Sequence, residues 1–259
     1  MKGRIAFVTG ATSGIGAACV RRFVAEGAKV VATGRRRERL ADLSRELGEA
    51  CHVVALDVRE RGPVERVFAE LPADFAAVDV LVNAAGGALG LGKADEARVE
   101  DWEEMIATNV RGLALLTRAA IPGMIARRRG HIVNLGSVAG SYSYPGGNVY
   151  GATKAFVERF SANLRSDLLG HPIRVTNIEP GMVETEFSLV RFGGDRAKAD
   201  AVYAGMKPLT AEDIADLVHF AVTRPPHVNV NRLEVMPVDQ AFGPFAVHRE
   251  HTGGRGRAT

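Results

Sequence analysis

The chain has 259 residues, with 33 lysines and arginines against 30 aspartates and glutamates, so its formal net charge is only +3. This near balance argues against a nucleic-acid partner, and no apolar run approaches the ~18 residues that a membrane-spanning helix needs. Two cysteines, Cys19 and Cys51, stand in no metal-ligand spacing, so we expect reduced thiols and no metal site. The N-terminus runs directly into a predicted strand without a signal peptide, which makes the cytosol the expected location.

The first predicted element is a strand over residues 5–9, an apolar run of the kind that is buried in a parallel sheet. A glycine-rich turn and then a helical pattern follow it. This succession is the context of a dinucleotide-binding loop, and an ordinary glycine turn is the alternative. Glycines let the backbone approach a pyrophosphate, and the N-terminus of the helix offers it unpaired N–H groups. We therefore expect cofactor contacts from Gly10, Thr12, Ser13, Gly14, Ile15 and Gly16.

The end of the second predicted strand, residues 29–33, bears on the choice of cofactor. NAD-binding folds often carry an Asp or Glu there for the ribose 2′-hydroxyl. Here Gly34 is followed by three arginines, and a guanidinium can bind a 2′-phosphate through two hydrogen bonds. The pattern predicts NADP(H), with Arg35 and Arg36 at the phosphate. We interpret Arg37 and Arg39 as the exposed start of the next helix.

Two further predicted strands, residues 51–56 and 78–82, also end in residues that suit a cofactor site. After the first, Asp57 could accept a hydrogen bond from the adenine amino group or could cap the next helix, and Val58 lies beside it. After the second come Asn83, Ala84 and Gly86, small or polar residues that leave room for a flat ligand. Open α/β sheets bind their ligands at these strand ends.

A long helical pattern over residues 100–128 carries Asn109 on an apolar stretch. A buried amide must be hydrogen-bonded. Asn109 could serve as a structural bridge between strand and helix, or it could hold a water beside Lys154.

The candidate catalytic residues follow the fifth predicted strand, residues 131–135. Ser137 comes directly after it, and an irregular loop could fold this serine back against Tyr150. Tyr150 and Lys154 are four residues apart on a predicted helix over residues 148–169, so their side chains share one face. A cation beside a phenol favours the phenolate and lowers its pKa, which would make Tyr150 able to exchange a proton with a carbonyl or alcohol. On its own, the pair is more often a solvated surface couple.

The segment after the sixth predicted strand, residues 173–178, begins with Pro180 and Gly181. Val183 and Thr185 follow as expected cofactor contacts, and Thr185 is well placed to bind a carboxamide. Residues 182–208 show no clear period, as a lid over the substrate would. Thr210 and Asp213 predict a capping box for a helix that runs to about residue 223, and a last strand is expected over residues 229–235.

Strands alternate with helices from residue 4 to residue 236, so we predict one α/β domain built on a doubly wound parallel sheet, the Rossmann arrangement. The domain should span residues 1–252. The glycine-rich end, residues 253–259, is expected to be disordered.

In these motifs the chain resembles the short-chain dehydrogenase/reductase family along nearly its whole length. The motifs are the glycine turn, residues 83–86, Asn109, Ser137, Tyr150 with Lys154, and residues 180–181. The resemblance implies seven strands ordered 3-2-1-4-5-6-7 and hydride transfer at the nicotinamide of NADP(H). It also implies that Tyr150 exchanges the proton, Lys154 binds the ribose, Ser137 orients the substrate and Asn109 supports a water relay. Ala84 departs from the family, in which many members have a second asparagine at this position.

Residues 148–156, 178–181 and 185–192 resemble more narrowly the NADP-dependent 3-hydroxy acid dehydrogenases, including those acting on serine and allo-threonine. The implied substrate is a small 3-hydroxy acid or its 3-oxo partner. Its carboxylate needs a cation, for which Arg191 is the candidate, with His248 or Arg249 behind it. A surface arginine in a mobile lid is the alternative interpretation of Arg191.

Two other functions stay open from the sequence. One is a short-chain reductase of bulkier ketones, such as 3-oxoacyl or sugar substrates. The other, from a different class, is a regulator that senses NADP(H) without turnover and would not need Ser137, Tyr150 and Lys154 together. The family resemblance further implies a homotetramer.

Overall fold

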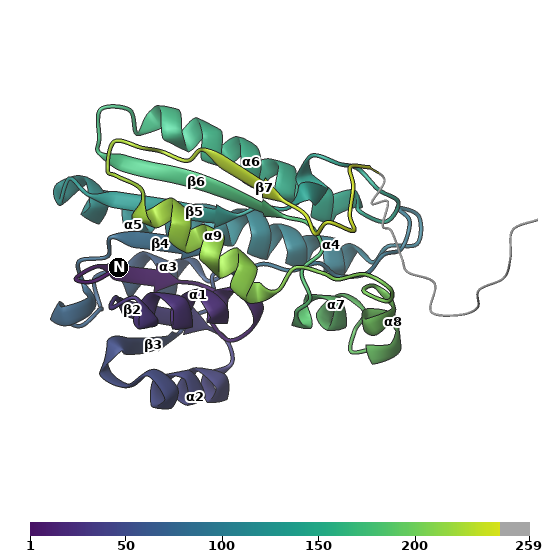
Figure 1. Ribbon diagram of the computed structural model, residues 1–259, viewed down its shortest axis with the longest axis horizontal. Coiled ribbons are helices and arrows are strands. Elements are labelled where there is room, and N and C mark those ends of the chain that lie inside the picture. Colours follow the sequence, from purple (N-terminus) through teal and green to yellow (C-terminus); the bar gives the residue numbers. More distant parts are fainter. Residues whose placement is uncertain (244–259) are drawn as a thin grey trace, which may run out of the picture.

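The computed structural model describes residues 1–243, and within them seven parallel strands form one sheet in the order β3-β2-β1-β4-β5-β6-β7 (Figure 1). The strands are β1 Ile5–Val8, β2 Lys29–Gly34, β3 Cys51–Ala55, β4 Val80–Asn83, β5 Gly130–Leu135, β6 Ile173–Pro180 and β7 Arg232–Val235. The order reverses between β1 and β4, which both continue a parallel ladder from Val8 and Val82. The predicted doubly wound sheet and its strand order are confirmed.

Helices cover both faces of this sheet (Figure 1). They are α1 Gly14–Ala25, α2 Arg37–Leu47, α3 Arg61–Val67, α4 Val99–Ile106, α5 Leu113–Ala126, α6 Asn148–Asp167, α7 Glu186–Arg191, α8 Arg196–Ala201 and α9 Ala211–Thr223. Side chains alternate across the strands, so Ala6 and Val8 of β1 pack with α1, α2 and α9, whereas Phe7 packs with α3, α5 and α6. The apolar strand runs thus follow from burial on two faces.

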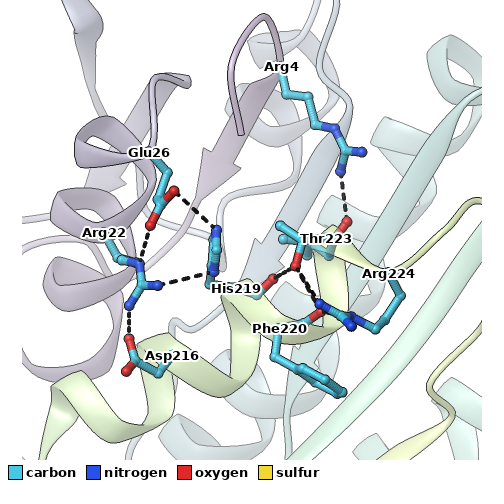
Figure 2. Close-up of polar contacts among 9 residues, drawn as sticks. Arg4, Arg22, Glu26, Asp216, His219, Phe220, Thr223 and Arg224 are labelled. Carbon is cyan, nitrogen blue, oxygen red and sulfur yellow. Dashed lines mark hydrogen bonds and ion pairs between the residues drawn. The ribbon is translucent and has the colours of Figure 1, made fainter.

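Helices α1 and α9 are also joined by polar contacts, which fix the helix that follows the glycine turn. Figure 2 shows the Arg22 guanidinium of α1 between Asp216 and His219 of α9, with Glu26 on its own helix. The predicted capping box is present at the start of α9, where Thr210 accepts from the backbone of Asp213. These contacts hold the N-terminus of α1 at a fixed place on the sheet edge.

The lid, residues 182–208, contains two short helices that its sequence did not predict. Thr185 caps α7 and Asp195 caps α8 through their side chains. Each helix has six residues, which is too short for a 3.6-residue period to emerge. At the base of the lid, Leu209 donates its N–H to Met182 O (3.0 Å), so both ends of the lid leave the sheet together.

Other features predicted from the sequence compare simply with the structure. Cys19 and Cys51 are free and buried. Among residues 1–243, no helix has the length and apolar content needed to span a membrane. The predicted disordered end and the candidates His248 and Arg249 lie outside the described residues.

Candidate active site

Two adjoining cavities lie where the strands end, as expected for an open α/β sheet. The first, about 350 Å³, is lined by the glycine turn and by residues that follow β2, β3 and β4. The second, about 540 Å³, is lined by residues that follow β5 and β6, by the start of α6 and by the lid. Both are within the usual size of small-molecule sites. They share Ile15, Ala84, Gly86, Gly87, Thr185 and Phe187.

The glycine turn forms a cradle for an anion in the first cavity. Gly10 and Gly14 have positive φ angles of 65° and 49°, which favour glycine. A Cβ on Gly16 would lie 2.3 Å from Gly10 O, so only glycine lets α1 start this close to the turn. The side chain of Ser13, the residue before α1, does not cap the helix, which leaves N–H groups of its first turn open to a phosphate. The six predicted loop residues all line this cavity.

The two arginines predicted at the 2′-phosphate, Arg35 and Arg36, also line the first cavity. Arg36 donates from Nε to Thr12 Oγ1 (3.0 Å) and from Nη2 to Ser13 Oγ (2.6 Å), so it is fixed against the glycine turn. Arg35 lies 3.5 Å from a Glu104 carboxylate oxygen and is exposed. These cations suit an additional phosphate beside the pyrophosphate cradle.

Asp57 and Val58 line the same cavity at its far end. The Asp57 carboxylate accepts from Arg59 Nη2 (2.6 Å), Nε and the backbone N–H (3.0 Å). The Arg59 guanidinium holds the pKa of Asp57 below its usual range, so the group is ionised. The helix-capping alternative is wrong, because Glu60 is the residue that precedes α3.

The end of β4 differs from the sequence interpretation in one residue. Asn83 turns its amide into the protein, donating to Asn134 Oδ1 (2.8 Å) and Thr117 Oγ1 (3.0 Å), and it lines neither cavity. The amide is 3% exposed, because these buried hydroxyl and amide groups satisfy it. Ala84, by contrast, lines both cavities, and its backbone N–H donates to Thr9 Oγ1 (3.0 Å), a link that the sequence analysis missed.

Asn109 lies in a π-helical turn, Ala107–Gly112, between α4 and α5. Its Nδ2 donates to Gly87 O (2.9 Å) and to Thr153 Oγ1 (3.0 Å), and its Oδ1 accepts from Gly87 N–H (3.0 Å). Asn109 therefore joins the loop after β4 to α6, one residue before Lys154. This is the structural bridge of the two alternatives, while the water relay stays a prediction. π-turns of this kind are frequent at functional sites.

The three candidate catalytic residues meet in the second cavity. Tyr150 lies in the first turn of α6 and is 8% exposed, and Lys154 is on the next turn with the same exposure. Ser137 Oγ accepts from Ala139 N–H (3.1 Å), which holds the loop after β5 in place. A hydrogen bond with Ser137 acts to lower the pKa of Tyr150, so this hydroxyl faces the phenol. The fold thus brings Ser137 back onto Tyr150 as predicted.

The expected lowering of the Tyr150 pKa is wrong for the protein by itself. Burial raises the pKa of Tyr150 to about 12, and it outweighs the opposing effects of Ser137 and Arg191. Lys154 does not offset this cost, since its Nζ donates to Leu135 O (2.8 Å) and lies 5.8 Å from the centre of the Tyr150 ring. Burial also lowers the pKa of Lys154 to about 8. Two buried groups thus have their pKa values drawn toward their neutral forms.

The other predicted residues of the second cavity come from the end of β6 and from the lid, and they are Pro180, Gly181, Val183, Thr185 and Arg191. Arg191 donates from Nη2 to Tyr144 OH (2.9 Å) and from Nε to Gly90 O (3.1 Å). Its guanidinium lies 5.5 Å from the ring centres of both Tyr144 and Tyr150, so it faces the candidate catalytic phenol.

Three aromatic residues of the second cavity were missed from the sequence: Tyr144, Phe187 and Tyr203. The Phe187 ring packs 5.7 Å from that of Tyr150, measured between ring centres. Tyr203 donates to Val183 O (2.8 Å) across the lid. The only available signal was proximity along the chain to Thr185 and Tyr150.

The family model that matches the chain is described as short chain dehydrogenase, and it covers residues 4–191. The chain belongs to this family, which confirms the resemblance seen in its motifs. An NADP-dependent 3-hydroxy acid dehydrogenase, YdfG of Escherichia coli K12, is 55% identical over 95% of this chain and 100% of the relative. A serine 3-dehydrogenase of Agrobacterium fabrum is 51% identical over 96% of this chain and 100% of the relative.

Solved structures are similar in the same way. The closed form of serine dehydrogenase complexed with NADP+ has a TM-score of 0.92 and 55% identity, covering 95% of this chain and all of that one. A serine dehydrogenase from Escherichia coli has a TM-score of 0.82 and 51% identity, covering 92% of this chain and all of that one.

The low pKa of Lys154 has a measurable effect on stability. From pH about 8 to about 10, unfolded chains bind a proton at Lys154 that folded chains do not, since the ordinary pKa is 10.5 and the folded value about 8. The unfolding free energy should therefore rise with pH, by about 1 kcal/mol per pH unit from this group. Tyr150 does not counter the rise below pH about 10, where it stays protonated in both states.

Urea unfolding of the cofactor-free protein at several pH values would measure this rise. The variant Lys154→Met, which keeps the side-chain length without an amine, should lack it. Parallel stability curves for the two proteins would show that Lys154 has an ordinary pKa in the fold.

Proposed function

We propose that this protein is an NADP-dependent oxidoreductase that transfers hydride between the nicotinamide and the 3-hydroxyl of a small 3-hydroxy acid. The observation that carries the proposal is the placement of the Arg191 guanidinium in one cavity with Ser137, Tyr150 and Lys154. A cation for a carboxylate and a proton-exchanging phenol thus face the same space. The names of the relatives, which act on 3-hydroxy acids or on serine, support this substrate class.

The cofactor suits the first cavity, and the chain's own residues account for the fit. The uncapped N-terminus of α1 and the glycine turn would hold the pyrophosphate, and Arg35 and Arg36 the 2′-phosphate. Lys154 would reach the nicotinamide ribose, and Thr185 the carboxamide. When bound, NADP(H) supplies the hydride donor or acceptor.

Each candidate catalytic residue has a separate task in this proposal. Tyr150 delivers a proton to the carbonyl oxygen, or takes one from the alcohol, as hydride moves at carbon. A phenol whose pKa is about 12 holds its proton, so it suits the reducing direction in this state. Ser137 donates to the same oxygen and orients it, and Lys154 adds positive charge nearby as the proton leaves. Asn109 would support a water relay behind Lys154.

The same features weigh against the alternatives. A reductase of bulkier ketones would be favoured by a lid without an inward-facing arginine, but Arg191 faces Tyr150. A regulator that only senses NADP(H) has no need for Ser137, Tyr150 and Lys154 in one cavity.

The assembly and location predicted from the sequence are further parts of the proposal. We infer a cytoplasmic homotetramer whose interfaces use the outer face of α6, helix α9 and strand β7. Exposed apolar residues support an interface there, namely Phe220 on α9 and Val238 after β7. Sedimentation velocity would give the mass of the assembly, and a monomer would contradict this inference.

Replacing Tyr150 with phenylalanine removes the proton and keeps the ring against Phe187. We expect kcat for reduction of a 3-oxo acid to fall by about 100-fold or more, because general acid catalysis contributes on that order. The dissociation constant of NADPH, measured by fluorescence titration, should stay within about twofold. Retained turnover with intact cofactor binding would exclude Tyr150 as the proton donor.

Replacing Arg191 with alanine tests the carboxylate contact. With acetoacetate and NADPH we expect KM to rise about tenfold to a hundredfold, as for loss of charge-assisted hydrogen bonds. The neutral analogue 4-hydroxybutan-2-one has no carboxylate, so its KM should change little. Arg191→Lys keeps the charge and loses the two-point geometry, and it should lie between. An equal loss on both ketones would place the substrate carboxylate elsewhere.

A further inference from the structure

The lid and the turn after β2 face one another across the first cavity. Glu186, the first residue of α7, lines this cavity from the lid side. Arg36 lines it from the opposite side, and Arg39 follows on the first turn of α2. Residues about 150 positions apart in the chain thus meet over the glycine turn.

Ion pairs join the two sides. Glu186 Oε2 accepts from Arg36 Nη1 (3.0 Å) and from Arg39 Nη1 (2.8 Å), and Oε1 also accepts from Arg39 Nη1 (2.8 Å). Arg39 donates in addition to Thr12 O (3.3 Å), so it ties the lid to the glycine turn itself. The hydrogen bond from Arg39, and then that from Arg36, lowers the pKa of Glu186, so the carboxylate is ionised at neutral pH.

We propose that Glu186 and Arg39 are positioning residues for NADP(H), forming a clasp that holds the lid across the cofactor cavity and slows release of the cofactor. The inference rests on the proposed placement of NADP(H) in the first cavity. It assigns a role to Arg39, which the sequence alone indicated only as the exposed start of a helix.

The clasp and the phosphate site do not exclude one another. Arg36 and Arg39 carry two positive charges and Glu186 one negative charge, so the cluster keeps an excess positive charge for a phosphate. Arg36 also bonds to Thr12 and Ser13, and a 2′-phosphate would draw it further toward the cavity. Arg39 has Glu186 as its only ion-pair partner within residues 1–243, so it can keep the lid tied while Arg36 turns to the phosphate.

The clasp is exposed, which sets the size of its effect. The side chains of Arg39 and Glu186 are 44% and 40% exposed, and they are accessible to salt. Exposed ion pairs contribute little, so release should quicken by about two- to fivefold when the clasp is broken. Screening weakens such pairs, and release from the unaltered protein should therefore quicken as salt rises.

The test uses Glu186→Gln, Arg39→Gln and the double variant in the full chain. NADPH is displaced from each by excess NADP+ in a stopped-flow fluorimeter. Arg37→Gln is the matched control, because it removes one positive charge from the same helix turn and Arg37 forms no ion pair within residues 1–243. We expect both single variants to release NADPH about two- to fivefold faster, the double variant to add nothing further, and Arg37→Gln to behave as the unaltered protein.

A second readout needs no cofactor. Hydrogen exchange of the α7 amides should be faster in Glu186→Gln and Arg39→Gln than in Arg37→Gln, because the lid has lost its tie. Unchanged release and unchanged exchange would overturn the clasp, and so would equal acceleration by Arg37→Gln. If the unaltered protein failed to bind NADPH, the proposed function would fail, whereas the exchange measurement would still decide whether the clasp exists.

Discussion

Burial of a phenol and an ammonium on one helix face is the constraint on which the rest of this structure depends. Tyr150 and Lys154 are held in the interior, where each favours its neutral form. Lys154 can stay there because Leu135 O, at the end of β5, accepts its hydrogen bond. The sheet therefore positions the amine, the helix positions the phenol, and Ser137 is returned to the same point by the loop after β5. A site of this kind needs the register of β5 with its neighbours to be fixed.

The sheet order provides that register and also separates the two tasks of the site. Strands β1 to β4 end in the glycine turn and the arginines, which suit phosphates, whereas β5 and β6 end in the groups that suit proton transfer. Thr185 and Phe187 of the lid line both cavities, so the lid is the element common to the two. In this arrangement one segment can respond to the cofactor and to the substrate.

Much of the fold could be predicted because its signals are local. The apolar strand runs, Gly10, Gly14 and Gly16, and the capping box at Thr210 each determine the backbone within a few residues. The i,i+4 spacing likewise placed Tyr150 above Lys154. Family resemblance, rather than spacing, gave the strand order and the roles of the site residues, and those roles stay predictions.

Other features were out of reach because they depend on distant contacts. The amide of Asn83 is turned inward by partners on other elements, and nothing in its own segment indicates which way it points. The Tyr150 pKa depends on burial, which a sequence motif does not reveal, and burial outweighed the nearby charge. Arg39 and Glu186 meet only after the lid folds over the glycine turn, and two six-residue helices leave no periodic signal.

The most direct test of the account is the rate of NADPH formation from NADP+ and 3-hydroxypropionate, followed by NADPH absorbance, with NAD+ as the parallel cofactor. The account predicts steady turnover with NADP+ and much slower turnover with NAD+. Tight NADPH binding with no turnover of 3-hydroxypropionate, serine or allo-threonine would contradict it, and it would indicate a protein that senses the cofactor without catalysis.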